Sequence, residues 1–74
     1  RFEAVLAMLQ REYPDAKQFD GLLIETDGHW TLFRPSGTEP ILRLTVEAKS
    51  DSALAGFFER YSGSLRAAVD GARR

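Results

Sequence analysis

The fold of this chain is decided by residues 30–48, WTLFRPSGTEPILRLTVEA. Two apolar runs flank the polar segment Arg34-Pro35-Ser36-Gly37-Thr38-Glu39-Pro40, and the second run alternates apolar and polar residues with the period of a strand. The polar segment combines a guanidinium group, two hydroxyl groups and a glycine between prolines that restrict the backbone. We interpret it as an anion-binding loop for phosphate between two strands. Proline, serine and glycine also form ordinary hairpin connections, so composition alone leaves a plain turn as the alternative.

Four residues of the loop are the candidate ligand contacts. The planar fork of Arg34 suits phosphate or carboxylate, and the hydroxyl groups of Ser36 and Thr38 are close enough in sequence to converge on one cluster of oxygens. Gly37 can adopt dihedral angles that bring its backbone N–H close to a ligand. The segment is neither a Walker A loop nor a dinucleotide-binding glycine motif.

The loop and the strand after it, residues 34–48, resemble the C-terminal domain of the alpha-D-phosphohexomutases. This family includes phosphoglucomutase, phosphomannomutase and phosphoglucosamine mutase. The similarity extends over most of the chain and is densest at residues 28–48. The resemblance implies a sheet flanked by two helices, with a loop that holds the phosphate of a phosphorylated hexose.

Carried over to this sequence, the resemblance implies that Arg34, Ser36, Gly37 and Thr38 contact the substrate's phosphate, while Glu39 and Pro40 complete the motif in a shaping role. In the family, a phosphorylated serine and a magnesium ion on other domains carry out phosphoryl transfer. No segment here matches those parts, so we expect no catalytic and no metal-binding residue in this chain. The parent would be an isomerase that interconverts hexose 1-phosphate and 6-phosphate through a bisphosphorylated sugar, and the isolated chain would be inactive.

Three strands are predicted around the loop, from about residue 19 or 21 to 26, from 30 to 34 and from 41 to 48, with Asp27-Gly28 as a hairpin turn. In the last strand one face is apolar and the other carries Arg43, which either reaches the anion site or pairs with Glu47 or Glu25. We favour the pairing. In the middle strand the sequence does not decide which face is buried.

Helices are predicted on both sides of these strands. The first already includes Arg1 and ends near Arg11 or Glu12, because Pro14 disfavours helical geometry in the residue before it. The second follows Ser50-Asp51-Ser52, which are preferred capping residues, and residues 62–64 are a point where it can bend or loosen. Its predicted core stripe is Leu54, Phe57, Phe58, Tyr61, Leu65 and Ala68 or Val69.

The assembled prediction is an α+β fold in the order helix–strands–helix, with an antiparallel sheet of three to four strands and two helices packed on one face. Residues 1–74 are expected to form one domain, cut from a larger multidomain enzyme, because the helical pattern already includes the first residues. A net charge of −1 argues against a general binder of nucleic acid or membrane surfaces. The absence of cysteine fits the cytoplasm. The single histidine, His29, follows the hairpin turn, and we expect it to be solvated and not catalytic.

The resemblance therefore favours the substrate-phosphate-binding domain of a phosphohexomutase, whose partners are a phosphorylated hexose and the other domains of the parent chain. Two alternatives stay open from the residues alone. One is a free-standing phosphate- or anion-recognition module, and the other is a structural oligomerisation domain whose loop is incidental.

Overall fold

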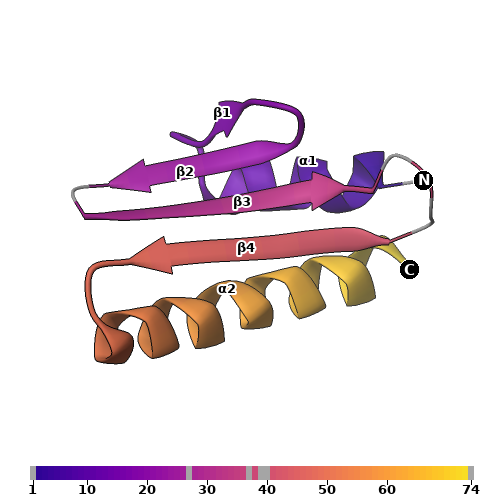
Figure 1. Cartoon of the computed structure of the whole chain (residues 1–74). Helices are drawn as coiled ribbons and strands as arrows, with labels where there is room; N and C mark the ends of the chain where they lie inside the picture. The colour runs from indigo at the N-terminus through magenta and orange to yellow at the C-terminus, as the bar shows by residue number, and fades with distance from the viewer. Residues whose placement is uncertain (1, 27, 37, 39–40, 74) are drawn as a thin grey trace.

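The computed structural model describes residues 2–26, 28–36, 38 and 41–73. It contains, in chain order, α1 (Glu3–Glu12), β1 (Lys17–Gln18), β2 (Leu22–Thr26), β3 (His29–Pro35), β4 (Leu42–Ala48) and α2 (Asp51–Ala72), as Figure 1 shows. Neither helix in this described part of the chain has the length and apolar character needed to cross a membrane.

The sheet has four strands in the order β1-β2-β3-β4, and every neighbouring pair is antiparallel. Thr26 pairs with His29, which confirms the predicted two-residue hairpin between β2 and β3, although Asp27 itself lies outside the described residues. The two-residue strand β1 precedes the three strands that the sequence predicted. The predicted α+β class is thus confirmed, with the sheet at the upper end of the expected number of strands.

Both helices cover the same face of the sheet. α1 lies behind β2 and β3, and α2 runs along β4, so that the sheet separates the helices from one open side (Figure 1). The fully formed core draws on both helices and the two central strands, and its members are Val5, Leu9, Leu22, Phe33, Tyr61 and Ala68. A small domain of this kind has one buried layer, and that layer decides the orientation of every strand.

The strand β3 shows which of its faces is inward, a point that the sequence left open. Thr31 and Phe33 are completely buried and face the helices, whereas Arg34 is exposed on the open side. Trp30 and Leu32 share the outer face with Arg34 and are half-buried there by their neighbours in the sheet. Because successive side chains of a strand point to opposite faces, the burial of Thr31 and Phe33 also fixes the outward position of Trp30, Leu32 and Arg34.

His29 is buried, so the expectation of a solvated histidine was wrong. Its Nδ1 lies 3.0 Å from the Thr26 hydroxyl oxygen, its Nε2 lies 2.6 Å from that of Thr31, and its ring stacks on Phe57 with centroids 3.9 Å apart. The residue directly after the hairpin already belongs to the inner face of β3, and α2 covers it. Two hydrogen bonds satisfy the ring, which is why a polar residue is tolerated there.

The helix α2 begins as predicted but departs from the predicted stripe. Ser50 is the N-cap, and its hydroxyl oxygen accepts a hydrogen bond from the backbone N–H of Ala53 at 3.2 Å. The helix continues without a break through residues 62–64, because Ser64 faces α1 and its Oγ lies 2.6 Å from the Tyr13 hydroxyl. Phe58 and Leu54, both predicted to be core, are 54% and 37% exposed, since they lie on the flank of α2 beside the edge strand β4.

The burial of His29 predicts that the domain becomes less stable in mild acid. Burial, followed by the positive charge of Arg60, lowers the pKa of His29 below its ordinary value of 6.5. The unfolded chain therefore takes up this proton first, so the free energy of unfolding should be constant above about pH 7 and should fall as the pH drops below about 6.5. Urea unfolding at a series of pH values between 5 and 8 measures this.

The matched control is His29→Gln, which removes the only histidine. Its stability should change much less with pH between about 5 and 7, where ordinary carboxylates stay ionised. An equal pH dependence in both proteins would contradict the assignment.

Two glycine substitutions should move stability in opposite directions. In α2, a Cβ added at Gly56 meets nothing within 4 Å, so Gly56→Ala should raise the free energy of unfolding by about 0.5–1 kcal/mol. Gly21 has φ +132°, and a Cβ there would lie 2.1 Å from the Phe33 carbonyl oxygen. Gly21→Ala should therefore cost more than about 2 kcal/mol. Urea unfolding compares the two, and a loss of stability in Gly56→Ala would show that α2 is packed differently.

Candidate functional site

The predicted loop joins β3 to β4 at one end of the sheet. Pro35 and Leu42 are the last register pair, and the backbone N–H of Ser36 donates to the Ile41 carbonyl oxygen at 2.8 Å, which closes the base of the loop. Gly37, Glu39 and Pro40 lie outside the described residues, so the roles predicted for them stay predictions. Both chain ends lie at this same end of the sheet (Figure 1).

Ser36 and Thr38 are connected across the first turn of the loop. The backbone N–H of Thr38 donates to Ser36 Oγ at 3.4 Å, a long hydrogen bond of the kind that serine forms in turns. Ser36 is half-buried and Thr38 is exposed. The structure thus brings the two predicted hydroxyl-bearing residues together at the start of the loop and leaves Thr38 open to solvent.

Arg34 is held at the entrance to the loop by an acidic residue that the sequence analysis missed. Its Nε lies 3.0 Å from Oδ2 of Asp20, in the turn between β1 and β2, with both side chains more than half exposed. A guanidinium group carries five N–H donors, so a bond through Nε restricts the side chain and leaves the four N–H donors of the Nη atoms. The Asp20-Gly21 dipeptide was a visible turn signal. Only the pairing of β2 with β3 brings it beside Arg34.

The Asp20 turn can approach β3 so closely because Gly21 follows it. Gly21 has φ +132° and lies against the backbone of Phe33 and Arg34. A Cβ at Gly21 would be 2.1 Å from the carbonyl oxygen of Phe33 and 3.0 Å from the Cα of Arg34. Asp20 itself has a positive φ of 52°, a conformation that aspartate tolerates better than most residues. Local backbone geometry therefore sets the position of the carboxylate that binds Arg34.

Arg43 on β4 lies directly opposite Arg34 on the neighbouring strand β3. The two are a register pair of β3 and β4, and both are exposed on the open face. Cβ atoms of such a pair are about 5 Å apart, and like charges directly opposite each other are destabilising in water. The structure thus concentrates two positive side chains beside the loop, although the whole chain carries a net charge of −1.

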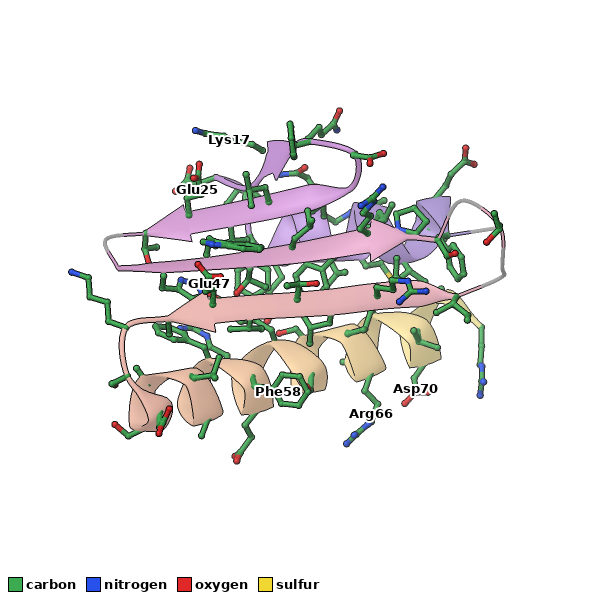
Figure 2. The ribbon with its side chains drawn as sticks, viewed as in Figure 1. Lys17, Glu25, Glu47, Phe58, Arg66 and Asp70 are labelled. Carbon is green, nitrogen blue, oxygen red and sulfur yellow. The ribbon has the colours of Figure 1, made fainter. Side chains whose placement is uncertain are left out.

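The carboxylates considered as partners for Arg43 have other contacts. Glu25 pairs with Lys17, with 3.3 Å between Nζ and Oε1, and Glu47 accepts a hydrogen bond from the indole N–H of Trp30 at 3.0 Å. Figure 2 shows Lys17 and Glu25 pointing toward one another from β1 and β2, with Glu47 on β4. These contacts lie toward the hairpin end of the open face. The role predicted for Arg43 stays a prediction.

The site has the donors of an anion-recognition element. Among the described residues, no three His, Cys, Asp or Glu side chains are grouped so as to hold a metal ion, so the magnesium ion implied by the resemblance does not fit a donor set in this part of the chain. His29 faces the helices, on the side of the sheet opposite to Arg34. What the arrangement can do is bind and orient a charged oxyanion between two guanidinium groups and a hydroxyl-bearing loop.

Comparison with known proteins identifies the family of the chain. Residues 2–63 match the sequence family described as phosphoglucomutase/phosphomannomutase, C-terminal domain. The chain belongs to this family. The resemblance inferred from residues 34–48 is thereby confirmed, and the matched region includes α1, the four strands, the loop and the first part of α2.

Related proteins extend the comparison to nearly the whole chain. A probable phosphoglucosamine mutase from Pyrococcus furiosus is 38% identical over 68 residues, which cover 92% of this chain. A probable phosphoglucosamine mutase from Methanopyrus kandleri is 38% identical over 65 residues, or 88% of the chain, and one from Methanothermobacter thermautotrophicus is 41% identical over 66 residues, also 88%. This phosphohexomutase C-terminal domain spans only 15%, 14% and 15% of the lengths of these three relatives, respectively.

The position of Arg34 predicts that it contributes little to folding. Its pair with Asp20 is exposed, with side-chain exposures of 55% and 70%, so Arg34→Ala should change the free energy of unfolding by less than about 1 kcal/mol. Its neighbour Phe33 is completely buried, and Phe33→Ala should cost about 3–5 kcal/mol. Thermal and urea unfolding of the two variants measure this contrast. A large loss of stability in Arg34→Ala would mean that the arginine has a structural role.

Proposed function

We propose that this chain is the C-terminal domain of a larger phosphohexomutase, an isomerase, and that it binds the phosphate group of the sugar substrate. The family match over residues 2–63 and the small share of each relative that the chain spans support this assignment. Neither a free-standing anion module nor a purely structural domain has a comparable observation in its favour.

The observation that carries the proposal is the pairing of Arg34 with Arg43 at the base of the loop. A dianionic phosphate beside strands β3 and β4 can accept charge-assisted hydrogen bonds from both guanidinium groups. The contact between Arg34 Nε and Asp20 already restricts the arginine side chain, so less conformational entropy is lost when phosphate binds. The proposal assigns phosphate contacts to Arg34, Ser36, Gly37 and Thr38.

Two further residues have supporting roles in this proposal. Arg43 adds positive charge beside the fork of Arg34, and Glu39 shapes the loop without contacting the ligand. Pro35 and Pro40 stiffen the ends of the loop, so that less backbone entropy is lost when the phosphate binds.

The contribution to catalysis would be orientation. The phosphate that is not transferred is a handle remote from the reacting group, and its binding energy positions the other end of the sugar. Because the bisphosphorylated intermediate must turn over between the two half-reactions, a moderate affinity at an exposed loop serves better than a tight one. Phosphoryl transfer, and the neutralisation of charge that magnesium supplies to it, belong to other domains of the parent chain in this proposal.

The relatives point to a first substrate to test. Several of them are probable phosphoglucosamine mutases, so glucosamine phosphate is the sugar that we propose for the parent of this chain. The loop recognises the phosphate and not the sugar ring. Phosphates of other hexoses should therefore bind this domain with similar affinity.

Titration of the isolated chain with glucosamine 6-phosphate should shift amide signals of residues 34–38 and 43 in two-dimensional NMR spectra. The affinity should be weak, and Arg34→Ala should lower it by about 10- to 100-fold, the equivalent of roughly 1.5–3 kcal/mol for a hydrogen bond to a charged group.

Two controls separate a specific site from general attraction of an anion. Unphosphorylated glucosamine should cause no shift at these residues, and Lys17→Ala should retain the affinity because Lys17 pairs with Glu25 away from the loop. Shifts that scatter over the molecule, or an Arg34→Ala variant that binds as well as the unchanged chain, would contradict the proposed function.

A further inference from the structure

One flank of α2 presents large apolar side chains to solvent. Phe58 is 54% exposed and Leu54 is 37% exposed. Together with Leu44 and Val46 they line a shallow groove between α2 and β4. β4 is the last strand of the sheet, so a free backbone edge borders the same groove. Apolar surface gathered beside a strand edge is typical of a protein interaction surface.

The groove continues along α2 past Ser62 toward the end of the helix, where Arg66 and Arg73 line it. Figure 2 shows Phe58, Arg66 and Asp70 along the outer side of the helix. The outer stripe of α2 consists of positions spaced three or four residues apart, which places them on one helix face: Asp51, Ala55, Phe58, Ser62, Arg66, Val69 and Arg73.

Charge is divided unequally along this outer stripe. Its first half begins with Asp51, while its second half contains Arg66 and Arg73, with Asp70 beside them, so that one positive charge is in excess. Within the part of the chain that the structure describes, neither arginine of the stripe forms an ion pair, since the pairs found there join Lys17 to Glu25 and Arg34 to Asp20. A stripe that is negative at one end and positive at the other is complementary to itself when it is reversed.

Reversal of the helix brings suitable side chains together. If two copies of α2 lie antiparallel about a two-fold axis at Ser62, residues equally far before and after Ser62 face each other. Asp51 then faces Arg73 of the second copy, and the exposed ring of Phe58 faces Arg66 of the second copy. Ser62 is small enough for the two helices to approach closely at the axis.

We propose that the outer stripe of α2 is a dimer contact, and that its occupant is a second copy of this chain. Each interface contains the Phe58–Arg66 contact twice, as a guanidinium group over an aromatic ring, and the Asp51–Arg73 ion pair twice at its rim. One helix stripe buries little surface, so the association is weak, with a dissociation constant on the order of tens to hundreds of micromolar. Arg34 is exposed on the face of the sheet opposite to the buried Phe33, so the dimer leaves the loop open.

Sedimentation velocity of the chain over a concentration range from about 10 µM to 1 mM tests the proposal, because that range spans the expected dissociation constant. The mass should rise toward that of a dimer. Phe58→Lys places a second positive charge opposite Arg66 of the other copy and should raise the dissociation constant at least about tenfold. Adding Arg66→Glu to Phe58→Lys should restore the association, because each introduced lysine then faces a carboxylate.

The control is Phe19→Lys, which makes the same change at a side chain that is 65% exposed, between β1 and β2 and away from α2. It should leave the dissociation constant unchanged. Circular dichroism verifies that every variant is folded, which is expected because both phenylalanines are exposed. A chain that is monomeric at every concentration overturns the proposal. The groove would then be a contact for a different protein segment. Equal weakening by the two lysine variants, or a folded double variant that stays monomeric, overturns it as well.

Discussion

The structure depends on the burial of one face of β3 beneath two helices. Phe33 and Thr31 are fully enclosed, and His29 is enclosed with them through its stacking on α2. Because successive side chains of a strand point to opposite faces, the burial of Phe33 commits Arg34 to the open side. A shift of one residue in the register would expose the core and bury the arginine, which makes this register strongly determined. The core thus orients the candidate site without taking part in it.

The separation of the two faces explains how a domain of 74 residues combines a small core with a charged site. On the inner side, packing and a few satisfied polar groups stabilise the fold, among them Ser64 bonded to Tyr13. On the outer side, Arg34 and Arg43 are exposed, and Arg34 forms a solvent-exposed ion pair with Asp20.

Much of the fold was predictable because its signals are local. Pro14 ends α1, Ser50 caps α2, and the alternation after Ile41 marks a strand, and the structure confirms all three. The errors concern burial. His29 was expected in solvent because it adjoins a turn, and Phe58 was expected in the core because it lies at the border of a wide apolar stripe. Neighbours along the chain do not reveal how α2 is rotated about its axis, and that rotation covers His29 and exposes Phe58.

The sequence by itself determined the residue types of the loop, the α+β order of elements and the family, because these follow from short segments with strong local preferences. Only the tertiary structure decided that the Asp20 carboxylate holds Arg34 and that Arg43 stands opposite it. These residues are brought together by strand pairing, which depends on how all strands share one small core. A contact of that kind is a property of the whole domain, since no short segment contains both of its partners.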